Sequence, residues 1–279
     1  MWTAMLQPAE FNALWRRLNL GERSLVLNPP DATDADQQAE AELRKRCLID
    51  GDGRTIASLS SALRTLARPT WELDLRWAPE VGAEYRVLVA ADNETAAVGS
   101  WDRQVIRLAQ VQPESMIKRM VDQLGRVSPG HGQSVSVPAA ALDRAASGGS
   151  AWDIERTLVS GGLSSADAST LIGMFGAKRL RAGQIGAAAW DAGGTRHRAP
   201  WVLTVFDTVR GRYVMYERRS MVTVSPVSRE QLSLLLTELL DSAHHTAQIP
   251  AVHRAVIQTQ SPVRDNSPIA TSVAGEEQS

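Results

Sequence analysis

Two acidic residues, Glu72 and Asp74, stand two positions apart and have the chemistry of a general acid–base pair. Such catalysis needs carboxyl or imidazole groups that converge on one substrate. Here the acids alternate with Trp71, Leu73 and Leu75, and this period of two predicts a β-strand with one buried face and one face in water. We therefore expect Glu72 and Asp74 on the solvent face, where carboxylates serve solubility.

Histidine and cysteine residues do not form a recognisable metal motif. The five histidines are scattered over a glycine-rich stretch, a turn and the C-terminal region (His131, His197, His244, His245 and His253). The single cysteine, Cys47, excludes an internal disulfide, and we interpret it as a small apolar residue near the end of a helix. The run 50–53 resembles the start of a calcium loop, but position 12 counted from Asp50 is Ser61, where an EF-hand needs a bidentate glutamate.

Familiar catalytic motifs are missing from the sequence. There is no phosphate-binding GxxxxGK[ST] loop, no GxGxxG dinucleotide motif after a strand, no HExxH and no GxSxG. The sequence therefore predicts no catalytic residues, no cofactor and no metal site. We interpret the chain as a binding protein rather than an enzyme.

The composition is that of a globular chain with a hydrophobic core, since 43% of its 279 residues are hydrophobic and 22% are charged. The 30 basic and 31 acidic residues give a net charge of −1, and the basic residues are dispersed, which argues against a nucleic-acid binder. The first ten residues lack the pattern of a signal peptide, and no apolar run approaches the roughly 20 residues of a membrane span. We expect a cytoplasmic protein.

The first half of the chain reads as helices followed by a strand meander. A short apolar run at 24–27 is expected to form an edge strand, and Asp34 is expected to cap the second helix. The helical periodicity falls at 8–18, 34–47, 56–66 and 113–124. The strand periodicity falls at 71–77, 85–91, 96–102 and 104–111.

The second half repeats this pattern. A shift of 115 residues superposes 85–124 on 200–239 and matches strand, turn, strand, turn, strand and helix. Two such units can join their sheets edge to edge. The predicted fold is therefore α+β, with one central antiparallel sheet built from two pseudo-twofold-related halves, each a helix, strand-meander and helix unit.

The domain boundaries follow from this repeat. One domain is expected over 1–248, with halves of about 1–125 and 150–245. The glycine-rich connection 125–150 is expected to have little regular structure beyond a weak strand near 135–137, and helices are expected near 151–159 and 164–174. The polar, proline-containing tail 249–279 is predicted to be disordered.

The second hairpin, turning at 207–212, carries a candidate partner surface. One of its faces mixes polar, aromatic and methionine side chains, a composition suited to an interface with a polar rim. The predicted contact residues on this face are Thr204, Phe206, Tyr213, Met215 and Glu217. The opposite face, which includes Val214, is expected beneath helices. The alternative, that helices also cover the mixed face, stays open at this point.

Three stretches of the sequence form a characteristic series. They are LIDGDG at 48–53 with LARP at 66–69 and ELDLR at 72–76, then AGQIGAA at 182–188 with GTRHR at 194–198, and finally DT at 207–208 with GRY at 211–213 and VTVSP at 222–226. Together these stretches resemble the EspG family of actinobacteria. The similarity covers about residues 8–245, and it rests on the order and spacing of these stretches.

The resemblance implies a cytosolic chaperone of type VII (ESX) secretion. Such a protein binds PE–PPE heterodimers at the tip of the PPE helical bundle, keeps them soluble and targets them to their secretion system. The resemblance also implies that the central sheet and the C-terminal helices form the binding surface. The loop 78–84, between the first two meander strands, is short here.

Two other functions stay open from the sequence alone. A structural adaptor that assembles through its sheet edges would form a stable oligomer and would have no affinity for PPE proteins. A small-molecule enzyme of unrecognised type would need a deep pocket with convergent polar groups. We expect a monomer or a weak dimer.

Overall fold

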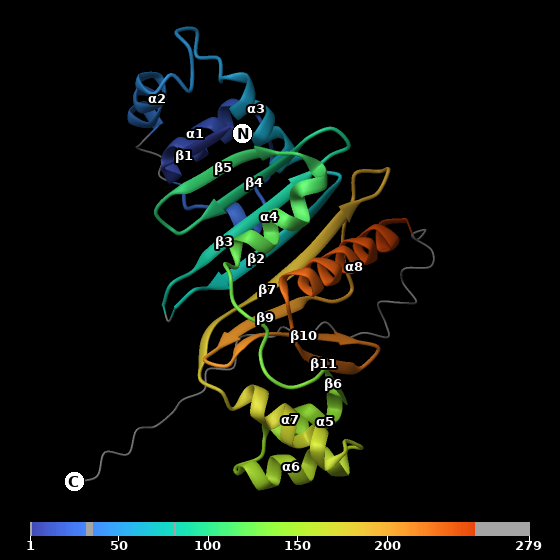
Figure 1. Ribbon diagram of the computed structural model, residues 1–279. Coiled ribbons are helices and arrows are strands. Elements are labelled where there is room, and N and C mark those ends of the chain that lie inside the picture. The colour runs from blue at the N-terminus through green and yellow to red at the C-terminus, as the bar shows by residue number, and fades with distance from the viewer. Residues whose placement is uncertain (1, 32–35, 81, 249–279) are drawn as a thin grey trace, which may run out of the picture. The chain divides into compact units, whose positions relative to one another are not determined.

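The computed structural model describes residues 2–31, 36–80 and 82–248 (Figure 1). Asp34, the predicted helix cap, and the tail 249–279 lie outside the described residues. A single sheet of eleven strands, all paired antiparallel within this part of the chain, runs through the molecule. The prediction of one continuous antiparallel sheet is confirmed.

The strands of this sheet fall into two sets on either side of a central pair, β2 and β7. In order across the sheet they are β1 (Thr3–Leu6), β5 (Ile106–Val111), β4 (Ala96–Trp101), β3 (Tyr85–Ala91), β2 (Trp71–Ala78), β7 (Arg179–Trp190), β9 (Leu203–Thr208), β10 (Gly211–Arg218), β11 (Met221–Pro226) and β6 (Val135–Pro138). The short β8 (Arg196–Arg198) pairs with the end of β7.

The repeat seen in the sequence appears in this order. Read outward from the centre, the first half runs β2, β3, β4, β5, β1 and the second runs β7, β9, β10, β11, β6. Adding 115 to the bounds of β5 gives those of β11, and the same shift places β4 within β10. The near-twofold rotation that would relate the two halves stays a prediction.

Helices cover both faces of the sheet (Figure 1). They are α1 (Pro8–Arg17), α2 (Asp36–Lys45), α3 (Ala57–Ala67), α4 (Met116–Gln123), α5 (Ala139–Ala146), α6 (Ala151–Ser160), α7 (Ser165–Phe175) and α8 (Arg229–Gln248), with the short 3₁₀ helices η1 (Leu25–Leu27) and η3 (Pro113–Ser115). On one face, α4 and α8 pack on an apolar cluster that spans both halves, with Leu73, Val214 and Leu236 at 0% exposure.

The opposite face is covered at its two ends (Figure 1). Helices α1–α3 and η1 pack on β3, β4 and β5 around Phe11, Leu63 and Leu88. Helices α5–α7 pack on β6, β10 and β11 around Leu171 and Val224. The middle strands of this face, β2 and β7, lie between the two helix groups.

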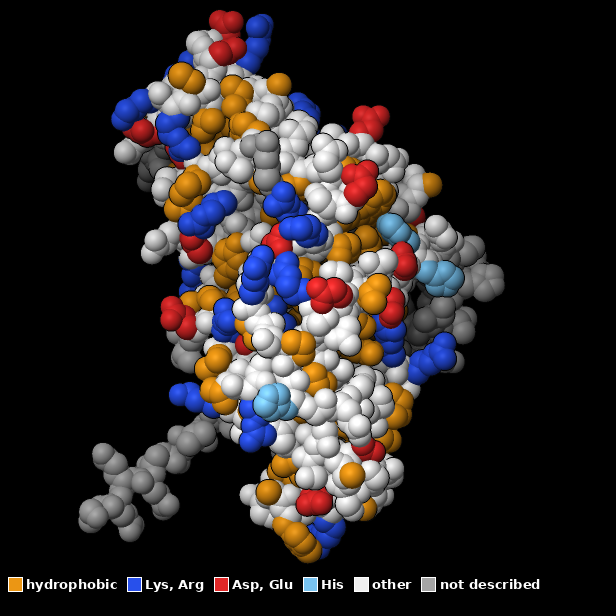
Figure 2. Space-filling view, viewed as in Figure 1, with side chains coloured by type: hydrophobic (Ala, Val, Ile, Leu, Met, Phe, Trp, Pro, Cys, Tyr) orange, Lys and Arg blue, Asp and Glu red, His pale blue; other side chains and the backbone are white. Residues whose placement is uncertain are grey.

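The view of Figure 2, taken from the same side as Figure 1, shows Lys and Arg side chains over α4 interspersed with Asp and Glu. The basic residues on this face therefore form no continuous stripe of the kind that follows a nucleic-acid backbone. This distribution agrees with the formal net charge of −1.

Three sequence-based expectations about local structure are wrong. The run at 24–27 forms η1 instead of a strand, because Val26 and Leu27 are both buried and strand alternation would bury only one of two neighbours. Cys47, interpreted as a small apolar residue of the structure, is exposed and lies just past the end of α2 with a φ of 55°. The connection 125–150 contains α5, where Ala141 and Ala145 are buried against neighbouring elements.

Candidate partner-binding site

The face between the two helix groups carries a row of polar side chains that we call the central strip. Register across the strands aligns them, since Asp74 lies opposite Gly186, and Gln184 lies opposite both Arg76 and Thr204. The central strip consists of Glu72, Asp74, Arg76, Gln184, Gly186, Arg196, Arg198, Val202, Thr204, Met215 and Glu217. It crosses β2, β7, β8, β9 and β10 and so contains residues of both halves.

Two carboxylates from β2 form the floor of the central strip. Glu72 and Asp74 are only 2% and 7% exposed, so the expectation that they face water is wrong. Arg196 Nε donates to Glu72 Oε1 at 2.9 Å, and Arg198 Nη2 donates to Asp74 Oδ2 at 3.0 Å. Burial raises the pKa of Glu72 above its usual value, and the Arg196 guanidinium opposes that rise.

The two guanidinium groups lie nearer to solvent than the carboxylates they bind. The side chains of Arg196 and Arg198 are 36% and 48% exposed, whereas those of Glu72 and Asp74 are 3% and 10% exposed. Arg196 also lies over the ring of Trp190, with 5.7 Å between its Cζ and the ring centroid. The carboxylates therefore hold two arginine side chains in place, and each of these side chains remains partly exposed.

Gly186 allows Arg198 to reach across β7 to Asp74. A Cβ atom at this position would lie 2.2 Å from Arg198 Nη2 and 2.9 Å from Asp74 Oδ2. Any side chain on residue 186 would therefore displace the guanidinium from the carboxylate. The need for glycine here comes from the close approach of these two groups, and the backbone does not adopt a positive φ at this residue.

The hairpin that carries β8 is held by a third pair of side chains. His197 Nε2 lies 2.7 Å from Asp191 Oδ2, and the other carboxylate oxygen of Asp191 accepts from the backbone N–H groups of Gly193 and Thr195 at 2.9 Å. The hydrogen bond from His197, followed by the backbone donors, lowers the pKa of Asp191 to about 2. All three residues of β8 thus contact an acidic side chain, which fixes the strand beside β7.

The structure divides the predicted contact residues of the second hairpin into buried and accessible groups. Phe206 and Tyr213 are each 1% exposed and pack within the cluster under α5–α7, so their expected place on an open surface is wrong. Phe206 stacks on Tyr213 with ring centroids 5.4 Å apart. Thr204 and Met215 are half-buried, and Glu217 is exposed. Only these last three belong to the central strip.

The opposite face of the same hairpin lies under α8, as expected. Val205 and Val214 are fully buried there. Trp201 Nε1 donates to Ser242 Oγ at 3.0 Å, and the Arg218 guanidinium lies over the Trp201 ring at 3.8 Å. This face is occupied by the protein's own helix.

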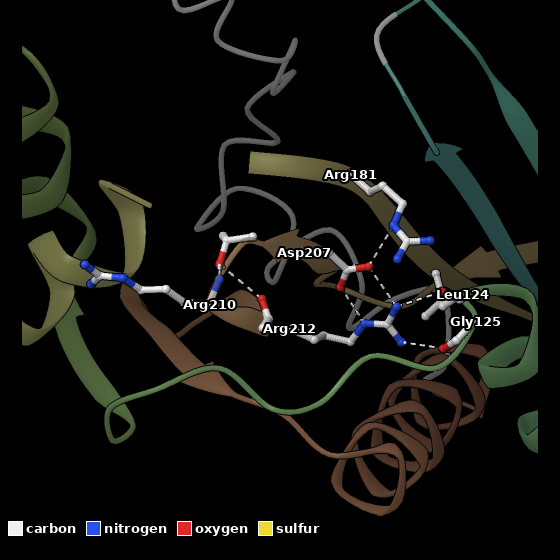
Figure 3. Close-up of polar contacts among 8 residues, drawn as sticks. Leu124, Gly125, Arg181, Asp207, Arg210 and Arg212 are labelled. Carbon is white, nitrogen blue, oxygen red and sulfur yellow. Dashed lines mark hydrogen bonds and ion pairs between the residues drawn. The ribbon is translucent and has the colours of Figure 1, made fainter. Parts of the chain in front are cut away.

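A buried ion pair flanks the turn of the hairpin (Figure 3). Arg212 donates from Nε to Asp207 Oδ1 at 2.7 Å and from Nη2 to Oδ2 at 2.9 Å. Arg212 also donates to the carbonyl oxygens of Leu124 and Gly125 at 2.7 and 3.1 Å, and Arg181 Nε lies 3.1 Å from Asp207 Oδ2. The hairpin is thereby joined to the end of α4 and to the start of the connection between the halves.

Sequence reasoning missed the arginines of the central strip because residues 194–198 read as a turn. A signal for them does exist in the sequence. Arg196 and Arg198 have the same spacing of two as Glu72 and Asp74, which is the spacing that places two side chains on one face of each strand. Matched acidic and basic pairs of this kind point to two strands that share a sheet.

Neither a metal-binding group nor a membrane-spanning helix occurs within the described part of the chain. Among the described residues, no group of three or more His, Cys, Asp and Glu side chains is arranged to hold a metal ion. His253, one of the scattered histidines, lies outside the described residues. None of the described helices has the length and hydrophobicity of a transmembrane span.

Comparison with known families decides the assignment. The model of the EspG family matches residues 7–238. The chain belongs to the EspG family. The membership suggested by the stretches at 48–76, 182–198 and 207–226 is confirmed. No curated protein matches the sequence.

The fold of this EspG-family protein also matches solved structures. One is the Mycobacterium tuberculosis type VII secretion system chaperone EspG5, solved in complex with the PE25–PPE41 dimer. The match has a TM-score of 0.70 at 15% sequence identity and covers 86% of this chain and 96% of that chain. At this identity the two proteins share the fold.

Proposed function

We propose that this protein is a cytosolic chaperone that binds a PE–PPE heterodimer through PPE, keeps it soluble and targets it to its ESX secretion system. The observation that carries the proposal is the match of nearly the whole fold to a chaperone that was solved with such a dimer bound. Membership in the EspG family supports the same function. Fold alone does not fix function, so the binding surface needs its own argument.

We assign the central strip as the surface that binds the PE–PPE heterodimer, which we call the client. It lies between the helix groups α1–α3 and α5–α7, whereas α4 and α8 occupy the opposite face of the sheet. Its side chains combine arginines, a half-buried methionine and hydrogen-bonding groups, the composition of an interface with a polar rim. Rigid strands position these side chains, which favours specific binding.

The edges of the sheet do not favour the structural-adaptor alternative. Arg46 donates to the carbonyl oxygen of Met5 on the edge strand β1. The other edge strand, β6, has four residues and ends at Pro138, which has no backbone N–H to donate. A short strand, a proline and an occupied carbonyl are devices that protect sheet edges from pairing with another chain.

Co-expression with PE–PPE pairs from the same genome tests the proposal. We expect one pair to co-purify with the protein and to elute with it as a single complex in size-exclusion chromatography. The Lys45→Glu variant serves as control, because Lys45 is exposed on α2, away from the central strip, and it should bind equally well. If no PE–PPE pair co-elutes with the unmodified protein, the proposed function is wrong.

A further inference from the structure

The arginines of the central strip have hydrogen-bond donors that the protein itself does not use. A guanidinium carries five N–H donors. Within the described residues, Arg198 donates only from Nη2, to Asp74, and Arg196 donates from Nε and Nη2, to Glu72. The Nη1 groups of both arginines and the Nε of Arg198 remain for another acceptor.

A third arginine extends this group along β2. Arg76 is exposed, follows Asp74 by two residues on the same face and lies opposite Gln184. No acidic side chain among the described residues forms an ion pair with it. The outward layer of this part of the strip therefore consists of three guanidinium groups, while the two carboxylates lie beneath them.

We propose that Arg76, Arg196 and Arg198 form a binding site for acidic side chains of the client. The inference rests on the proposed function, because it names the chemistry by which the client is recognised on the central strip. Guanidinium groups bind carboxylates through paired, charge-assisted hydrogen bonds. Arg196 and Arg198 are already oriented by buried acids, so little side-chain freedom is lost when a carboxylate binds.

A purely structural role would be different. If the arginines served only to neutralise Glu72 and Asp74, the guanidinium groups would matter for folding and hardly for binding. Arg76 has no such carboxylate to neutralise, yet it lies on the same face. This residue separates the two roles, because its removal leaves both buried ion pairs intact.

The experiment measures the dissociation constant of the purified chaperone with its co-purifying PE–PPE heterodimer at low and at high salt. Arg76→Gln should weaken binding about tenfold at low salt and leave the melting temperature unchanged. Its binding should also depend less on salt, since one exposed charge pair is lost.

A paired variant tests the arginines that hold buried carboxylates. Asp74→Asn combined with Arg198→Gln removes the exposed guanidinium without leaving an unpaired buried charge, and it should also weaken binding about tenfold. The matched control is Asp52→Asn combined with Arg54→Gln, which removes the same two charges from an exposed ion pair outside the central strip. This control should bind as tightly as the unmodified protein.

The possible results separate the two proposals. If the unmodified protein binds the heterodimer and both arginine variants bind with the same affinity and salt dependence, the acidic-recognition site is refuted and the proposed function stands. An equal loss of binding in the Asp52→Asn, Arg54→Gln control would also refute the site, because the loss would then not depend on where the charges lie. If the unmodified protein binds no heterodimer, the proposed function fails and this inference fails with it.

Discussion

The buried ion pair beside the turn of the second hairpin leads to a quantitative stability prediction. Arg212→Met keeps the length of the side chain and removes its charge. Asp207, at 0% exposure, would keep only its contact with Arg181, while the carbonyl oxygens of Leu124 and Gly125 would lose their donors. Breaking one side of a buried ion pair costs about 3–5 kcal/mol. For a unit of this size that corresponds to a drop in melting temperature of about 6–20 °C.

Equilibrium unfolding in urea, followed by circular dichroism, measures this loss. The matched control is Arg210→Met, two residues away. Arg210 is exposed and donates one hydrogen bond to the carbonyl of Gly173 at 3.3 Å, so its loss should cost less than about 0.5 kcal/mol. If the free energy of unfolding of Arg212→Met lies within about 1 kcal/mol of that of the unmodified protein, the Asp207–Arg212 pair does not join the halves as described.

A compensated variant identifies the cause of the loss. Asp207→Leu combined with Arg212→Met replaces both charges by apolar groups, and such replacements of buried pairs are often neutral. We expect the double variant to be more stable than Arg212→Met alone, because no unpaired carboxylate remains. A double variant that is no more stable than the single variant would show that the stranded carboxylate is not the cause of the loss, since both variants lack the hydrogen bonds to Leu124 and Gly125.

Three further predictions concern the hairpin, the pH dependence and the tail. Val214→Glu should unfold the protein, because a carboxylate would enter the fully buried cluster under α8. Met215→Glu, on the half-buried central strip, should fold but fail to co-purify with the PE–PPE heterodimer. The reverse outcome would place the binding surface on the other face of the sheet. Hydrogen bonds from Arg86 and then Arg103 lower the pKa of Glu84 from 4.5 to about 2, so this acid stabilises the fold above pH 4.5 and the gain is lost as the pH falls toward 2. Glu84→Gln should therefore flatten the decline of melting temperature over that range, and an unchanged decline would contradict the assignment. Truncation after residue 248 should change the free energy of unfolding by less than about 0.5 kcal/mol, and a melting temperature several degrees lower would show that the tail packs on the domain.

Most strands and helices could be predicted from the sequence because their patterns are local. Alternation in β2 and the 115-residue repeat of strands and turns need only neighbouring residues to be recognised. The helix α5 and the strands β1, β7 and β8 were not predicted, because their local patterns are weak. Five of the eight residues of α5 are alanines, β7 is rich in Ala and Gly, and β1 and β8 have only four and three residues.

The burial of particular side chains could not be predicted, because it depends on partners distant in sequence. Nothing near Phe206 and Tyr213 indicates that α7 and the connection cover them, and Tyr213 exchanges hydrogen bonds with the backbone of His131, 82 residues earlier. The same mixed face stays open two residues further along each strand, at Thr204 and Met215. A single face of one hairpin is thus part core and part surface.

The central strip shows most clearly why the site needs the complete chain. Its acids, Glu72 and Asp74, come from the first half, and the arginines that bind them lie 124 residues later in the second half. Neither half alone would pair these charges, and an isolated first half would expose two carboxylates on a bare sheet. The junction of β2 with β7 therefore both joins the repeats and creates the polar surface between them. The repeated strand order supplies the scaffold, and the residues that differ between the two halves supply the chemistry.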